Sequence, residues 1–247
     1  MTINDLIPAV QAILQNRSDV SETQANPEMR PSVWLRKAIT NLSSKYIYEE
    51  LRVIGPMVTL GPGLGFQGSN SIYPVKMFLQ PGDDYTFNAT SMVIFLDPPN
   101  NTVGYPMDYM QPKAIVPLVN IPGGVPFKYT RYGSNFWFGV QPGNTYNVYF
   151  PYQRKHSFNK DNLINSEVFI PEDWIEAVEW SAAERGAQVL RWNDQATFIH
   201  TTLFGDPEYQ SSGGVTGRPG LLAGLILQQE RDQSQSVRQM VCVSQRY

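Results

Sequence analysis

Proline and glycine clusters cut the middle of the chain into short segments. The clusters are Pro81-Gly82, Pro98-Pro99-Asn100-Asn101, Pro122-Gly123-Gly124, Gly133-Ser134 and Pro142-Gly143, and residues of these types favour β-turns because of the φ values they adopt. The runs between them, rich in residues that favour strands, are 72–79, 91–96, 114–120, 125–132, 135–140 and 145–150. Strands at this spacing are typical of an antiparallel β-sandwich or barrel. We therefore predict such a domain over residues 45–170.

Two stretches in this region resemble each other. Residues 80–87 begin Gln-Pro-Gly-Asp-Asp-Tyr, and residues 141–148 begin Gln-Pro-Gly-Asn-Thr-Tyr. We interpret both as hairpin tips. The simpler alternative is that Pro-Gly turns recur in any sheet, since no longer repeat accompanies them.

Helical patterns lie on either side of the predicted β domain. In the N-terminal segment, residues 1–44, apolar side chains recur at helical spacing from Ile3 to Leu14, with Thr2 as a candidate cap, and a second helix is predicted over residues 31–39. The clearest helix covers residues 171–185: Pro171 starts it, acids fill its first turn, and Trp174, Val178 and Ala182 share a face. We predict a long loop after it, to residue 217.

The last segment, residues 218–247, is predicted to be a helix followed by an extended tail. It is apolar over residues 221–227, polar over 228–239 and strand-like over 240–243. A helix of ordinary globular length fits the first part, and the remainder would need a partner. The overall expectation is an α+β, mainly β chain with helices at both ends.

Charge is scarce in this chain. Charged residues make up 17% of it, against about 25% in typical soluble domains. The formal net charge is −3 and no long basic run occurs, so the footprint of a protein that grips nucleic acid by bulk charge is missing. One cysteine, Cys242, cannot form an internal disulfide, and residues 1–14 lack the basic start of a signal peptide. We expect a soluble protein made in a cytoplasm.

The residues that carry chemistry form no recognisable constellation. Gly63-Leu64-Gly65-Phe66-Gln67-Gly68 has the letters of a dinucleotide-binding loop, but a strand-like segment follows it where a helix is required. His156 and His200 each lack a second ligand at metal-binding spacing. We therefore expect no catalytic, cofactor or metal site, and no enzyme. One hydrolase alternative stays open, with Asp83, Asp84, Glu49 and Glu50 as candidate carboxylates.

Tryptophan and arginine concentrate in the C-terminal half, and both are enriched at interface hot spots. Trp174 and Trp180 are six residues apart, so on one helix they point about 120° from each other. One of the two is expected to face something other than its own core. The candidate partner-interface residues are Trp174, Trp180, Arg185, Arg191, Trp192, Arg218, Leu221, Leu222, Leu225, Arg231, Arg238 and Tyr247.

The order of these parts resembles the head-to-tail adaptor (connector) proteins of tailed bacteriophages. The resemblance rests on the short N-terminal helices, the Tyr/Pro/Gly-rich β domain, the helix at residues 171–180 and the Gln/Arg-rich C-terminal tail. It implies a virion protein forming a ring of roughly a dozen copies below the portal, with C-terminal tails docking the portal and the β domain meeting the tail or nozzle. DNA would pass through the channel without specific binding.

Other readings of the sequence remain open. The chain could equally resemble another tail-tube, nozzle or baseplate component. Its 13 tyrosines and 5 tryptophans are compatible with a β module that binds carbohydrate or a cell surface.

Overall fold

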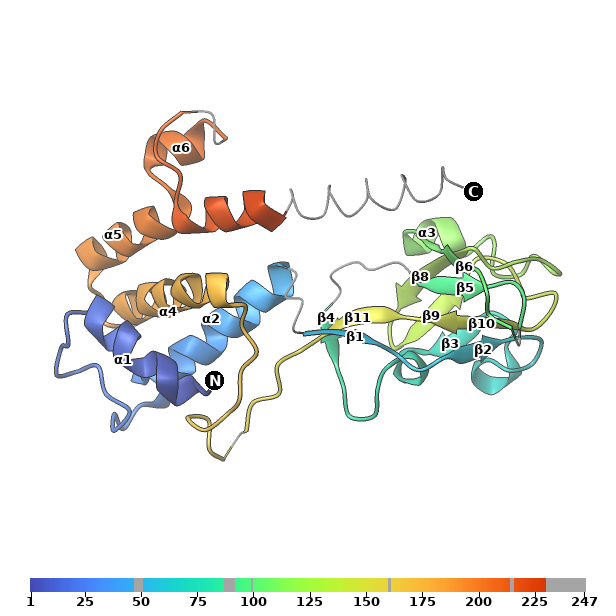
Figure 1. The fold of residues 1–247 in the computed structure, drawn as a ribbon, viewed down its shortest axis with the longest axis horizontal. Coiled ribbons are helices and arrows are strands. Elements are labelled where there is room, and N and C mark those ends of the chain that lie inside the picture. The colour runs from blue at the N-terminus through green and yellow to red at the C-terminus, as the bar shows by residue number, and fades with distance from the viewer. Residues whose placement is uncertain (47–50, 87–91, 99, 160, 214–215, 230–247) are drawn as a thin grey trace. The chain divides into compact units, whose positions relative to one another are not determined.

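The computed structural model describes residues 1–46, 51–86, 92–98, 100–159, 161–213 and 216–229. The fold is α+β, with antiparallel sheets in the middle of the chain and helices at both ends, as predicted (Figure 1). The expectation of a mainly β chain is wrong, because 40% of the chain is helix and 18% is strand. The predicted strand-like end of the tail, residues 240–243, lies outside the described residues.

The chain divides into two compact units. A helical unit consists of Met1–Glu50 together with His156–Tyr247, and a β unit consists of Leu51–Lys155. The β unit is thus narrower than the predicted range of 45–170, and it is inserted between the two parts of the helical unit.

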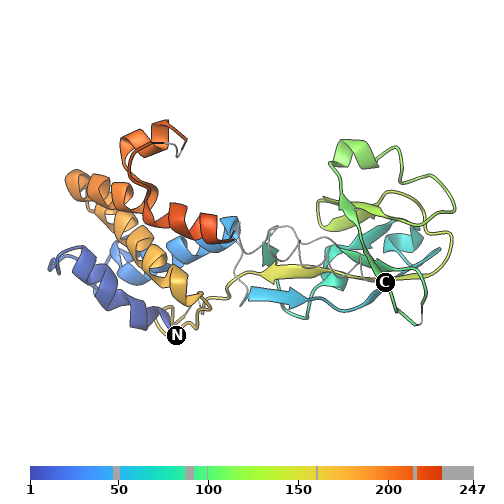
Figure 2. The ribbon, with the colours of Figure 1, turned by 45° about the horizontal axis from the view of Figure 1, so that its top comes forward.

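The helical unit is arranged around one central helix. Its helices are α1 (Ile3–Ile13), α2 (Pro31–Lys45), α4 (Ile175–Val189), α5 (Asn193–Phe204) and α6 (Pro207–Ser211), and residues 221–229 are also helical. Short 3₁₀ turns cover η1 (Pro27–Met29) and η5 (Glu172–Trp174). Helix α4 contacts α1, α2 and α5 and lies between α5 and the α1–α2 pair (Figure 1, Figure 2). Small side chains on α4 allow this crowding: Ala177, Ala182, Ala183, Gly186 and Ala187 are all buried.

The predicted first helix and its cap are confirmed. The Thr2 backbone N–H donates to the Asp5 carboxylate at 2.7 Å, which closes the first turn of α1. That carboxylate also accepts the Thr2 hydroxyl, and these bonds lower the pKa of Asp5. Helix α2 begins at Pro31 as predicted and continues beyond residue 39, to Lys45.

The long loop predicted after residue 185 is wrong. Helix α4 continues to Val189, and α5 and α6 follow it. Helix α5 carries threonines, phenylalanines and an isoleucine, residues with modest helix propensity. It is held by packing: Ile199 and Leu203, four residues apart, are both fully buried.

The β unit contains three small sheets. The first has the order β1-β11-β4, with β1 at Arg52–Ile54, β11 at Pro151–Arg154 and β4 at Tyr85–Thr86. The second has the order β2-β10-β5-β6, with β2 at Val58–Leu60, β10 at Tyr146–Tyr149, β5 at Val93–Phe95 and β6 at Gly104–Pro106. The third has the order β3-β9-β8-β7, with β3 at Ile72–Pro74, β9 at Asn135–Phe138, β8 at Lys128–Tyr132 and β7 at Asp108–Tyr109. Every strand pair among the described residues is antiparallel except β7 with β8.

Strands of all three sheets contribute to one buried core, which is dominated by aromatic rings. Phe136 lies near its middle, with ring centroids 5.3 Å from Phe78, 5.2 Å from Phe150 and 6.0 Å from Tyr129. All three contacts are edge-to-face, which the ring quadrupole favours. Five of the tyrosines, Tyr73, Tyr85, Tyr129, Tyr146 and Tyr152, are buried here, so much of the aromatic content serves as core.

Three local predictions in the β unit are wrong. Residues 114–120 do not form a strand; they belong to the short helix α3 (Pro112–Ile115) and the turns after it, because Pro112 takes the first helical position. Only the start of the run 72–79 is strand, since η4 (Val75–Phe78) follows β3. The Pro-Gly turns at 81–82 and 142–143 are not hairpin tips: η4 precedes the first, and the second connects β9 to β10, which belong to different sheets.

Candidate interaction surface

Three of the predicted interface residues are core residues. Trp174 is 4% exposed, and its ring centroid lies 4.9 Å from that of Tyr46 at the end of α2. Leu222 and Leu225 on the C-terminal helical segment are also buried. The segment at residues 221–229 is therefore packed into the helical unit. These three side chains are not available to a partner in this conformation.

Trp192 and Arg191 form the tight turn between α4 and α5. Arg191 has a positive φ of 56° and an exposed side chain. The Trp192 ring is half-buried, and the Arg17 guanidinium lies 4.9 Å from its centroid. Arg17 is itself paired with Asp19 at 2.6 Å. Trp192 thus stacks on the connection between α1 and α2, a contact within the helical unit.

Trp180 does face away from the core occupied by Trp174, as the six-residue spacing predicts. It is half-buried on α4, and its ring centroid lies 6.1 Å from that of Phe198 on α5. Phe198 is 57% exposed. We name this pair the α4–α5 aromatic surface. The sequence reasoning missed Phe198, because residues 193–204 were predicted to be a loop and not a helix.

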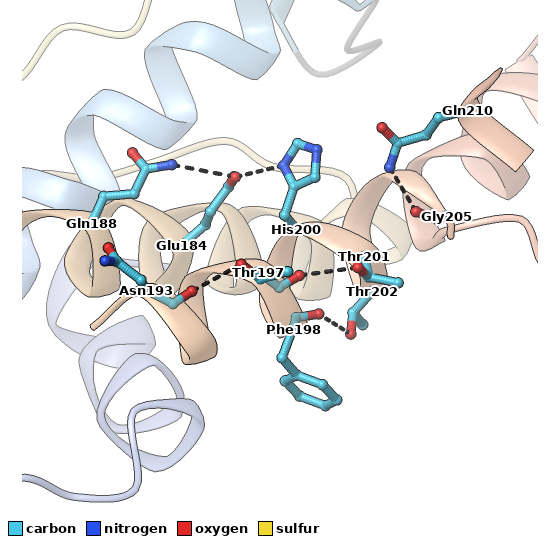
Figure 3. Close-up of polar contacts among 10 residues, drawn as sticks. All are labelled: Glu184, Gln188, Asn193, Thr197, Phe198, His200, Thr201, Thr202, Gly205 and Gln210. Atoms are coloured by element: carbon cyan, nitrogen blue, oxygen red, sulfur yellow. Dashed lines mark hydrogen bonds and ion pairs between the residues drawn. The ribbon is translucent and has the colours of Figure 1, made fainter. Parts of the chain in front are cut away.

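A polar network joins α4 to α5 (Figure 3). His200 Nδ1 lies 2.8 Å from Glu184 Oε1, and Gln188 Nε2 donates to the same oxygen at 3.4 Å. The His200 ring also lies 4.6 Å from that of Phe204. Figure 3 shows Phe198 pointing away from this network, on another side of α5. His200 thus links two helices.

Threonine hydroxyls on α5 are satisfied within the helix (Figure 3). Thr197 donates to the Asn193 carbonyl at 2.9 Å, Thr201 to the Thr197 carbonyl and Thr202 to the Phe198 carbonyl, each at 3.0 Å. Side chains that bond their own backbone in this way need no further partner. The outer side of α5 therefore presents the Phe198 ring and threonine methyl groups.

Arg218 lies near the end of the segment that connects α5 to the helix at residues 221–229 and contains α6. The Asp206 carboxylate accepts from the Tyr209 N–H at 2.8 Å and from the Arg218 N–H at 2.9 Å, which lowers the pKa of Asp206. Gln210 Nε2 donates to the Gly205 carbonyl at 2.7 Å and ties α6 to the end of α5 (Figure 3). The Arg218 side chain is exposed, as is that of Arg185 on α4, whereas Leu221 is half-buried. The remaining predicted interface residues, Arg231, Arg238 and Tyr247, lie outside the described residues.

The candidate carboxylates of the hydrolase alternative serve the fold of the β unit. Asp83 accepts the Tyr152 hydroxyl at 2.5 Å. Asp84 pairs with Lys155 at 2.7 Å, a bond that lowers the pKa of Asp84, and it also accepts the Tyr85 N–H. Glu49 and Glu50 lie outside the described residues.

Metal-binding and membrane-spanning features were sought over the described part of the chain. Within it, no three His, Cys, Asp or Glu side chains gather as a metal site would require. None of the helices in that part combines the length and apolar character needed to cross a membrane. His156 bonds the Phe169 backbone through Nε2.

No protein-family model and no curated protein matches the chain.

Proposed function

We propose that the protein is a structural virion component of the phage head–tail interface, where copies form a ring below the portal, connect it to the tail and line the DNA channel. The observation that carries this proposal is the α4–α5 aromatic surface, which leaves the Phe198 ring 57% exposed beside Trp180. Such a protein works by geometry, sealing and positioning its neighbours, and carries out no turnover.

The distribution of charge supports a protein covered by other subunits. The β unit carries only eleven charged residues, Arg52, Lys76, Asp83, Asp84, Asp97, Asp108, Lys113, Lys128, Arg131, Arg154 and Lys155. Its exposed apolar side chains include Ile54, Leu64, Tyr105, Tyr109 and Tyr132. Interface cores are depleted in charge and enriched in aromatic residues. Scattered exposed apolar residues alone are ordinary, so the weight lies on their combination with the shortage of charge.

The finer architecture belongs to the same proposal. We infer that the three sheets close around their common aromatic core as a sandwich or barrel, which gives the ring a rigid β domain to meet the tail or nozzle. The segment beyond residue 229 would then be the extended tail that docks the portal. A net charge of −3 suits a channel through which DNA slides, because a basic lumen would hold phosphates.

The full chain, purified and mixed with the portal protein of the same virus, tests the proposal. Light scattering and negative-stain images should show rings, either of the protein alone or on the portal. A chain ending at Gln229 keeps the packed helix with Leu222 and Leu225, so it should fold but lose portal binding. A protein that stays monomeric both alone and with portal would refute the assignment.

A second candidate function is binding of a carbohydrate or a cell surface. It is favoured by Tyr132, which is 56% exposed on the β8–β9 hairpin with its ring centroid 5.0 Å from that of Trp137. Exposed paired rings of this kind suit the faces of sugar rings. Binding on a glycan array that is lost in Tyr132→Ala and kept in Tyr109→Ala would support this function over the first.

A further inference from the structure

We draw no further inference here: the strongest candidate, the cluster of uncharged loops at residues 61–71, 117–126 and 139–145 of the β unit, which leaves Leu64, Phe66 and Ile121 exposed, carries nothing because nothing in the structure shows what covers it.

Discussion

Gly186 sets how closely the central helix packs against α2, and replacing it with alanine should destabilise the helical unit. A Cβ on Gly186 would lie 2.6 Å from both Cε3 and Cζ3 of Trp34, and 3.0 Å from Cδ1 of Leu14. Carbon atoms in contact prefer about 3.5 to 4.0 Å, so the indole would have to move by about 1 Å. It has little freedom to do so, because Trp34 is fully buried and its Nε1 donates to the Glu28 carbonyl at 2.7 Å.

The expected magnitude follows from two opposing effects. Overpacking a core costs about 1 to 3 kcal/mol, and this site should fall in the upper part of that range because the ring is fixed by a hydrogen bond. Alanine is favoured over glycine inside a helix by about 1 kcal/mol. Gly186→Ala should therefore lower the free energy of unfolding by about 1 to 2 kcal/mol, equivalent to about 2 to 8 °C in melting temperature.

The assay is urea and thermal unfolding followed by circular dichroism at a helix-sensitive wavelength, with tryptophan fluorescence as a second probe. Four of the five tryptophans, Trp34, Trp174, Trp180 and Trp192, belong to the helical unit. Gly224→Ala is the matched control: it makes the same change in the helical segment 221–229, where an added Cβ meets no atom within 4 Å. It should be neutral or slightly stabilising. If Gly186→Ala is as stable as Gly224→Ala, the packing argument is wrong.

Two further predictions concern the β unit. The buried Tyr73 hydroxyl accepts from the Gly61 N–H at 2.9 Å and donates to the Gly61 carbonyl at 3.1 Å, so Tyr73→Phe should cost about 1 to 3 kcal/mol, while the exposed Tyr132→Phe costs almost nothing in the same denaturation assay. Burial raises the pKa values of Tyr85 and Tyr152 to about 12, and for Tyr152 the Asp83 carboxylate adds to the shift. Since an unfolded tyrosine has a pKa of about 10, the folded state keeps these protons longer, and stability that is complete below about pH 10 should be lost as the pH rises toward 12. Urea unfolding across that range should show a steep fall in stability that is shallower in Tyr152→Phe; equal slopes would contradict the assignment.

The helices with strong local signals were predictable from the sequence. Helix α1 has an apolar stripe and a threonine cap. The segment that forms η5 and α4 follows Pro171 and carries acids in its first turns. Helix α5 was not predictable in the same way, because its threonines and phenylalanines favour other structures and its helix depends on burying Ile199 and Leu203 against α4. For the same reason, the sequence did not predict that the helical unit includes α5.

The sheets and the candidate surface could likewise be predicted only in part from the sequence. Turn residues marked where strands end, yet nothing local to Pro142-Gly143 indicates that β9 and β10 enter different sheets, since pairing partners lie far away in the sequence. The tryptophan spacing correctly separated Trp174 from Trp180. The sequence did not reveal that Leu222 and Leu225 are buried in the core. It also did not reveal that the Arg17 guanidinium packs on the Trp192 ring, because these contacts join segments that are distant in the sequence.

The insertion of the β unit has a consequence for the order of folding. Its first and last strands pair with each other, with Arg52 opposite Gln153 and Ile54 opposite Pro151. Once this pairing forms, the ends of the inserted unit are held together, and the long connection between α2 and α4 behaves as a short one. The entropic cost of closing that loop has then already been met when the β unit folded. During synthesis, residues 51–155 can fold before α4 is made. The two parts of the helical unit can then pack together, because the pairing of β1 with β11 holds the ends of the inserted unit close to each other.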